Sequence, residues 1–144
     1  MQTIIAFFRL IRFQNLVIIA ATQYLMRYAI IDSLLSNLYV AGEGGLLKLP
    51  ELELQLTHFQ FLSLVLSTIF LTAAGYVIND YFDTKTDLLN RPERVIVGKL
   101  IPRRWAMFIH ITFNVLGIGF GFYVSYSLGM TYLLVVFLVV TGLL

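Results

Sequence analysis

Long apolar runs separated by polar segments dominate the pattern along the chain. The runs cover Phe13–Ile31, His58–Ile78, Trp105–Val124 and Met130–Leu144. A helix of about 20 apolar residues crosses the roughly 30 Å hydrocarbon layer of a bilayer. The first three runs approach this length and predict transmembrane helices. The fourth run has fifteen residues, and we expect a fourth helix that is cut short where the sequence ends.

Two polar stretches separate the first three runs. Residues 32–57 carry three glycines and Pro50 and predict a loop, although Leu46–Leu56 has an ambiguous periodicity and could also lie along the membrane surface. Residues 79–104 form a second, strongly charged stretch, which we expect to be a loop between the second and third helices. In the third run, Gly117, Gly119 and Gly121 offer a flat face for close helix packing.

Composition supports a protein embedded in a membrane. Hydrophobic residues make up 59% of the chain and charged residues 12%, with a mean hydropathy of +0.86, whereas soluble domains average about 25% charged residues. There are no cysteines, and the two histidines are too few and too far apart to predict a zinc site. We therefore expect an all-α, multi-pass transmembrane helical bundle in the cell membrane, with membrane lipids as partners and no nucleic acid.

The basic residues predict the orientation. Eight of the ten lie before the first apolar run or in the stretch 79–104, and only Arg27 and Lys48 lie between the first and second runs. Because cytoplasmic loops carry an excess of Lys and Arg, the N-terminus and the stretch 79–104 are predicted to be cytoplasmic. Arg27 is then near the opposite face, and we expect its side chain to extend to that interface.

The charged stretch opens with Asn79-Asp80-x-x-Asp83-x-x-x-Asp87. If the second helix runs on through it, the three aspartates fall within an arc of about 60° on one helix face, with Asn79 at its edge. Such like charges repel one another unless a cation joins them. Magnesium prefers oxygen ligands and commonly binds a few carboxylates together with phosphate oxygens of a substrate. We predict that Asp80, Asp83 and Asp87 bind Mg²⁺.

Basic residues suited to phosphate follow the aspartates. Arg91, Arg94 and Lys99 lie within loop distance, and a guanidinium group matches the geometry of phosphate oxygens. Charged residues of a membrane protein's loop are usually only solvated surface, but three aspartates aligned on one arc favour a site for a metal and a diphosphate. Asn15, in the first run, either reaches a substrate head group or hydrogen-bonds another helix.

At these residues the chain resembles the UbiA superfamily of intramembrane prenyltransferases. The first aspartate-rich motif of that family is Asn-Asp-x-x-Asp-x-x-x-Asp after the second helix, as in Asn79–Asp87 here, and Asn90–Arg94 resembles the branch that prenylates geranylgeranylglyceryl phosphate. The resemblance implies a fold of about nine helices with a second aspartate-rich motif after the sixth. Residues 1–144 would then be the N-terminal part of such a domain, truncated and inactive alone.

The resemblance implies a magnesium-dependent transfer of a polyprenyl group from its diphosphate to a lipid-like acceptor, with geranylgeranylglyceryl phosphate as the expected acceptor. Asp80, Asp83 and Asp87 would hold the metal and act as the catalytic residues. Asn79, Asn15 and the basic residues Arg91, Arg94 and Lys99 would bind substrate. Two alternatives stay open: an aromatic acceptor, as in quinone synthesis, or a non-catalytic membrane subunit or transporter fragment. A CDP-alcohol phosphotransferase fits less well, since its Asp-Gly-x-x-Ala-Arg opening is missing.

Overall fold

The structure is a computed structural model that describes residues 2–36, 39–42, 45–48 and 56–143. Its helices are α1 (Gln2–Leu10), α2 (Phe13–Leu25), the π-helical turn η1 (Met26–Ile31), α3 (Asp32–Ser36), α4 (His58–Asn90), the 3-10 turn η2 (Pro92–Arg94), α5 (Arg103–Ser127) and α6 (Tyr132–Leu143). Strands β1 (Tyr39–Gly42) and β2 (Gly45–Lys48) form an antiparallel hairpin in which Tyr39 pairs with Lys48.

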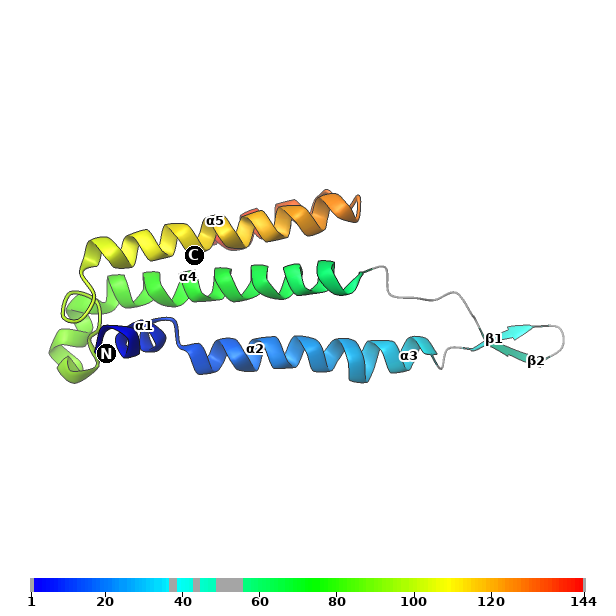
Figure 1. The fold of residues 1–144 in the computed structure, drawn as a ribbon, viewed down its shortest axis with the longest axis horizontal. Helices are drawn as coiled ribbons and strands as arrows, with labels where there is room; N and C mark the ends of the chain where they lie inside the picture. Colours follow the sequence, from blue (N-terminus) through cyan, green and yellow to red (C-terminus); the bar gives the residue numbers. More distant parts are fainter. Residues whose placement is uncertain (1, 37–38, 43–44, 49–55, 144) are drawn as a thin grey trace.

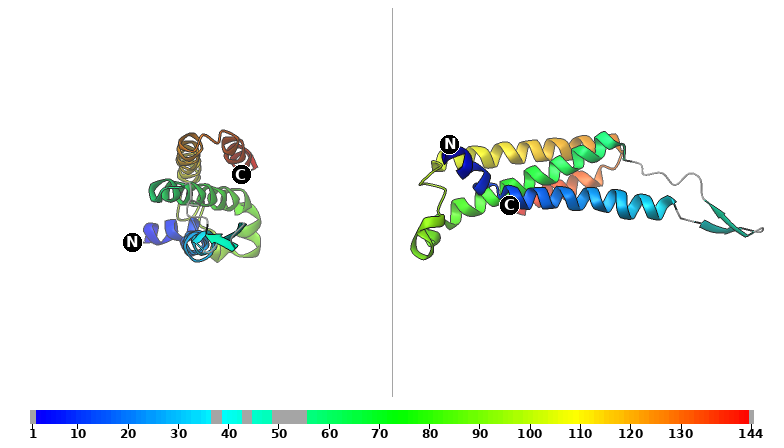
Figure 2. Two further views of the ribbon diagram at one scale, coloured as in Figure 1. Left: turned by 90° about the vertical axis from the view of Figure 1, so that its right-hand side faces the viewer. Right: turned by 60° about the horizontal axis from the view of Figure 1, so that its bottom comes forward.

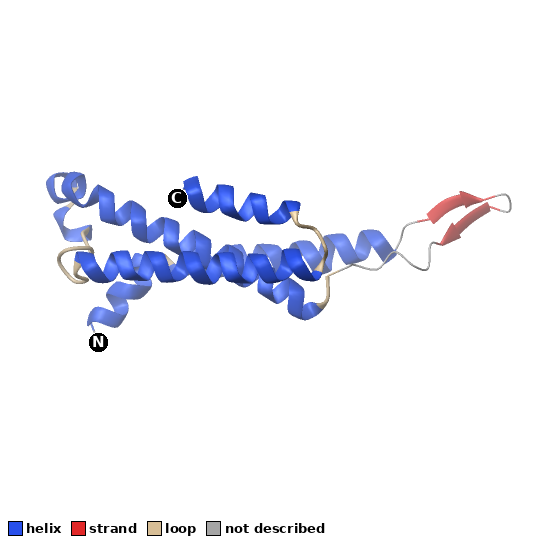
Figure 3. Cartoon of the chain, turned by 90° about the horizontal axis from the view of Figure 1, so that it is seen from above, coloured by secondary structure: helices blue, strands red, loops and turns tan. Residues whose placement is uncertain are grey.

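The helices form an elongated bundle with α4 at its centre. Helix α5 packs along one side of α4 and α2 lies along the other, while α6 turns back beside α5 (Figures 1 and 2). Apart from the hairpin, the described chain is helices joined by short turns (Figure 3). The N-terminus, the end of α4 and the turn into α5 gather at one end of the bundle (Figure 1). We call this the aspartate end, because it holds Asp80, Asp83 and Asp87.

The predicted helical layout is confirmed. Helices α4 and α5 are each long and apolar enough to cross a membrane, and α1 with Phe13–Leu34 passes the same test as a pair bent by 48°. Helix α6 is apolar but has only 12 residues. The hairpin was not predicted. Of the segment Leu46–Leu56, the structure places residues 46–48 in strand β2, and residues 49–55 lie outside the described residues.

The prediction of a loop over residues 79–104 is wrong for its first half, because α4 continues to Asn90. No glycine or proline interrupts the sequence between Gly75 and Pro92, so nothing in it breaks the helix. Pro92 then disfavours helical backbone at the residue before it, and Arg91 has φ −147° and ψ 63°. At about 1.5 Å per residue, the 33 residues of α4 are about 50 Å long, which is longer than the roughly 30 Å hydrocarbon layer of a bilayer.

The beginning of the chain also differs from expectation. Helix α1 precedes the predicted first span and is joined to α2 through Ile11 and Arg12, whose φ of 50° places Arg12 in the left-handed region. Helix α1 is amphipathic and buries Ala6 and Leu10. A regular first span was expected from hydropathy alone, which does not register a single residue that changes the direction of the helix.

Arg27, predicted to extend toward the far interface, contacts the start of α4. Its side chain is buried, with 6% of its surface exposed. One Nη donates a hydrogen bond to the carbonyl oxygen of Leu56 at 2.8 Å, and the guanidinium lies 4.5 Å from the centre of the Phe61 ring. The positive charge is therefore held between the first span and the start of α4.

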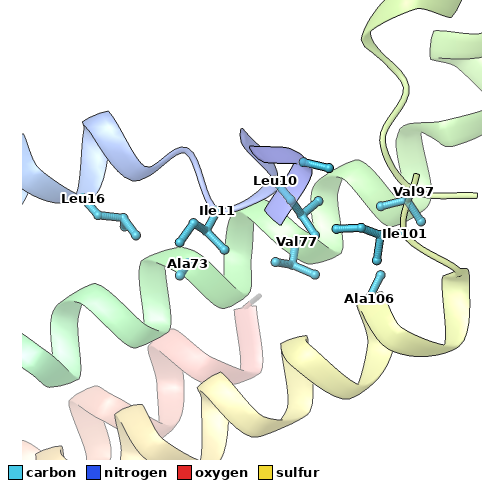
Figure 4. Packing of buried hydrophobic residues seen from close by; sticks show 9 residues of the cluster. Leu10, Ile11, Leu16, Ala73, Val77, Val97, Ile101 and Ala106 are labelled. Carbon is cyan, nitrogen blue, oxygen red and sulfur yellow. The ribbon is translucent and has the colours of Figure 1, made fainter. Parts of the chain in front are cut away.

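The main apolar core lies directly beneath the aspartate end. It joins the break between α1 and α2 to α4 and to the turn before α5, through nine buried residues that Figure 4 shows: Ala6, Leu10, Ile11, Leu16, Ala73, Val77, Val97, Ile101 and Ala106. This core packs residues on each side of the break in the first span against one face of α4. It therefore fixes the positions of Arg12 and Asn15 relative to the aspartates.

Helices α4 and α5 approach closely along small residues. The Ser67 hydroxyl donates a hydrogen bond to the carbonyl oxygen of Gly117 at 2.7 Å. A Cβ atom at Gly117 would meet Leu71 Cγ at 2.7 Å and the Leu71 backbone nitrogen at 3.2 Å, whereas a Cβ at Gly119 meets nothing within 4 Å. Of the glycines predicted to form a flat face, Gly117 therefore makes this contact and Gly119 does not.

We expect Gly117→Ala to lower the thermal unfolding temperature in detergent. Overpacking of this kind costs about 1–3 kcal/mol, because the backbone of Leu71 cannot move aside as a side-chain tip can. Gly119→Ala is the matched control and should leave stability unchanged or raise it slightly, since alanine favours a helix by about 1 kcal/mol over glycine. Equal effects of the two substitutions would contradict this packing.

Candidate active site

The three aspartates lie on the last third of α4, all on one side of it. Asp83 is exposed, while Asp80 and Asp87 are half-buried. With a rise of about 1.5 Å per residue, Asp80 and Asp87 are separated by about 10 Å along the helix axis. Accordingly, no group of three or more His, Cys, Asp or Glu side chains in the described part of the chain is close enough together to hold one metal ion. The successive pairs, three and four residues apart, are neighbours on the helix surface.

Arg12 is the cation that the fold brings to Asp80. Its Nη2 atom lies 3.4 Å from Asp80 Oδ1, and its guanidinium is 4.7 Å from the centre of the Tyr76 ring. Tyr76 and Asp80 are one helical turn apart on α4, so a single guanidinium covers both. Arg12 reaches them from the break between α1 and α2, where the core fixes its backbone.

A second cation comes from α5. The Arg103 guanidinium lies 4.3 Å from the centre of the Tyr81 ring, at the start of that helix. Tyr81 follows Asp80 directly, so one cation from the α1–α2 break and one from α5 cover two aromatic rings of α4. Neither Arg12 nor Arg103 was predicted to be a site residue.

The predicted phosphate-binding residues are less closely placed. Arg91 is exposed at the end of α4, and its backbone N–H bonds the Asp87 carbonyl at 2.8 Å. Lys99 is also exposed, but its Nζ donates to the carbonyl oxygen of Pro92 at 2.7 Å, so it folds back onto its own turn. Arg94 lies in η2, and its side chain lies outside what the structure describes.

Asn79 opens onto a cavity between α4 and α6. The cavity has a volume of about 420 Å³ and extends along α4 from Asn79 to Thr68, which is about 16 Å at the helical rise. Most of its lining is apolar, with side chains of α6 such as Phe137 on the far side. Asp83 follows Asn79 by one helical turn. The cavity therefore runs along α4 from Thr68 toward the aspartates.

Asn15 bonds another helix, which was one of the two roles considered for it. Its Nδ2 donates to the Tyr76 hydroxyl at 3.4 Å. Arg12 and Asn15 are three residues apart and both contact Tyr76. The spacing of these two polar residues at the start of an apolar run was the one signal in the sequence that could have indicated a shared polar face toward another helix.

Residues 41–143, which are 103 of the 144, match the family model described as the UbiA prenyltransferase family. The chain belongs to this family. The resemblance seen at Asn79–Asp87 is thereby confirmed over most of the length of the chain.

Several relatives of this UbiA-family chain are named digeranylgeranylglyceryl phosphate synthase. The protein from Methanothermobacter thermautotrophicus is 41% identical over 75 residues, covering 51% of this chain and 27% of the relative. That from Pyrococcus abyssi is 34% identical over 84 residues, covering 58% and 30%, and that from Haloquadratum walsbyi is 54% identical over 43 residues, covering 30% and 15%. The chain thus matches less than a third of each relative's length, and no solved structure matches it.

We expect Arg12→Gly to leave the UbiA-family fold as stable as it is with arginine. Glycine removes the cost of a left-handed backbone, about 1–2 kcal/mol. This offsets the lost contacts to Tyr76 and to Asp80, since an exposed ion pair contributes about 0–1 kcal/mol. Arg12→Ala loses the same contacts and keeps the backbone cost, so it should unfold at a lower temperature than Arg12→Gly. An alanine variant as stable as the glycine variant would show that the break is not strained at this residue.

Proposed function

We propose that this UbiA-family chain carries part of the active site of a magnesium-dependent enzyme that transfers a geranylgeranyl group from its diphosphate to geranylgeranylglyceryl phosphate. The observation that carries the proposal is the alignment of Asp80, Asp83 and Asp87 on one side of α4, beside an apolar cavity that begins at Asn79. The name shared by the relatives supports the acceptor, since such a synthase forms a glyceryl phosphate with two geranylgeranyl groups.

The residues present fit magnesium. Carboxylate oxygens are its usual protein ligands, and it keeps several positions for water and substrate phosphates. The neighbouring pairs Asp80–Asp83 and Asp83–Asp87 each offer carboxylates on adjacent turns, which suits an ion that takes one or two carboxylates rather than three. When bound, the metal would neutralise charge that develops on the departing diphosphate.

The proposed reaction exchanges one carbon–oxygen bond for another. The bond between the allylic carbon and the diphosphate oxygen breaks, and its electron pair leaves on the diphosphate. The acceptor hydroxyl oxygen bonds to the allylic carbon, and its proton passes to the released diphosphate, which carries the electron pair of the broken bond. Arg12, beside Asp80, is placed to stabilise the negative charge of the diphosphate.

We assign the prenyl chain to the cavity between α4 and α6. Its apolar lining would receive an alkyl chain out of water, and Asn79 at its mouth lies one turn from Asp83. A diphosphate held at the aspartates would therefore have its chain directed down the bundle. Thr68 and Thr72 also line the cavity, but their hydroxyl groups need no hydrogen-bond partner inside it. Each hydroxyl already donates to a backbone carbonyl of α4.

The proposal includes an orientation and a place in a longer domain. The aspartate end carries the excess of basic residues and is proposed to face the cytoplasm. The chain is proposed to be the N-terminal part of the domain, with the remaining ligands of the diphosphate supplied by the rest of the protein. Activity therefore has to be measured on the native protein that contains these residues.

Asp83→Asn in the native protein should reduce magnesium-dependent transfer by at least a hundredfold, because Asp83 belongs to both proposed ligand pairs. Asp32→Asn is the matched control: the same change at the opposite end of the first span should leave transfer unaltered. Formation of digeranylgeranylglyceryl phosphate from the labelled diphosphate measures the rate. Undiminished transfer by Asp83→Asn would refute the site, and a preference for 4-hydroxybenzoate or dihydroxynaphthoate over the lipid would refute the acceptor.

Thr72→Phe should shorten the prenyl chain that the native protein accepts, because the larger ring occupies the cavity below Asn79. We expect the ratio of kcat/KM for geranylgeranyl over geranyl diphosphate to fall about tenfold or more, since each buried methylene of a long chain contributes roughly 0.8 kcal/mol. Ile111→Phe, an exposed position of α5 outside this cavity, should leave the ratio unchanged. An equal effect of both substitutions would place the chain elsewhere.

A further inference from the structure

A second cavity lies at the break between α1 and α2. It has a volume of about 610 Å³ and is lined by Ile5, Phe8, Arg9, Arg12, Phe13, Gln14 and Asn15. We call it the break pocket. It shares no lining residue with the cavity between α4 and α6, so it offers room for a different ligand.

The break pocket combines positive charge with apolar surface. It contains two arginines and two side-chain amides and no acidic residue among its lining. Arg12 is paired with Asp80, whereas the Arg9 guanidinium has no hydrogen-bonding or ion-pair partner within the part of the chain that the structure describes. Ile5, Phe8 and Phe13 are each about half exposed. Such a lining matches a molecule with an anionic head and an apolar tail.

We propose that the break pocket binds the phosphate head group of a lipid phosphomonoester, and that this lipid is the acceptor in the function proposed above, on which the inference rests. The hydrogen-bond donors of the pocket support a monoester over a diester. A phosphomonoester presents three strong acceptor oxygens, which suit the guanidinium groups of Arg9 and Arg12 and the nearby side-chain amides, whereas a diester presents only two. The absence of a carboxylate from the lining also separates this pocket from a site for a metal-bound diphosphate.

Arg12 connects the two sites. It lines the break pocket, and its Nη2 lies 3.4 Å from Asp80 on α4. An acceptor phosphate at Arg9 and Arg12 and a diphosphate at the aspartates would therefore lie on two sides of one guanidinium. This arrangement keeps two anionic substrates close while a cation stands between them.

The apolar part of the pocket continues into the outer face of α1. Ile4 is 63% exposed and borders Ile5 and Phe8 on a short amphipathic helix. In a membrane this face meets the alkyl region near the interface. A lipid whose phosphate is held at Arg9 can thus lay its chain along Phe8 and Ile5 without leaving the bilayer.

The first test is kinetic and uses the native protein. Arg9→Gln should raise KM for geranylgeranylglyceryl phosphate by roughly tenfold or more, the usual loss for a hydrogen bond to a charged group, and leave KM for geranylgeranyl diphosphate unchanged. Arg104→Gln, an exposed arginine at the same end outside the pocket, is the matched control and should change neither. An unchanged acceptor KM, or equal increases in both KM values, would overturn the inference.

The second test measures binding without transfer. The native protein in detergent is titrated calorimetrically with an alkylglyceryl phosphate, with its methyl phosphodiester and with the alkylglycerol, in the absence of magnesium and diphosphate. We expect the monoester to bind at least tenfold more tightly than the other two, and Arg9→Gln to abolish the difference. Equal binding of monoester and diester would identify general contact with anionic lipid instead and refute the acceptor site.

The two tests separate this inference from the function proposed above. Selective, Arg9-dependent binding of the monoester by a protein that transfers no prenyl group would support the pocket and refute the transferase. Transfer that persists with an unchanged acceptor KM in Arg9→Gln would support the transferase and refute the pocket.

Discussion

The continuity of α4 is the constraint on which the remaining structure depends. Within a bilayer every backbone N–H and C=O must be bonded inside its own segment, and the helix that meets this need continues without a break from His58 to Asn90. Its inner part provides the surface on which the bundle assembles, through Ser67 toward α5 and through Ala73 and Val77 toward the first span. Its outer part carries the aspartates in a fixed helical register. Packing in the bundle and the geometry of the candidate site are therefore set by one element.

Hydropathy was sufficient to predict the number and order of the apolar helices, because the bilayer imposes a length that a run such as His58–Ile78 plainly meets. The spacing of Asp80, Asp83 and Asp87 was equally readable, since it depends only on the helical repeat. The end of α4 was predicted too early because the charged residues after Ile78 were interpreted as a loop. A charged residue such as Lys85 favours a helix once the helix has left the membrane. The residue that ends α4 is Pro92, which could have been identified from the sequence.

The cations beside the aspartates, Arg12 and Arg103, could not be predicted from their distance along the sequence. Lys99 follows the aspartates closely, yet its turn is anchored by the buried side chains of Val97 and Ile101 and its amine bonds Pro92. Arg12 lies 68 residues before Asp80 and meets it only because the α1–α2 break packs onto α4. A left-handed residue at that break has no signature in hydropathy. Contacts of this kind depend on tertiary packing, and only a structure gives them.

We propose that the two anionic substrates bind at two different sites, and this assignment follows from the chemistry of each site. Carboxylates repel a bare phosphate and accept one that arrives with a divalent metal, so the proposed site at Asp83 would select for a diphosphate that binds magnesium well. A pocket with guanidinium groups and no carboxylate in its lining, as proposed at Arg9, would gain nothing from a metal and would select for the phosphate itself. Exchange of the two substrates between the sites would be unfavourable in both directions. Arg12 belongs to both surroundings, and its fixed position at the helix break would hold the two substrates in the relative placement that ether formation requires.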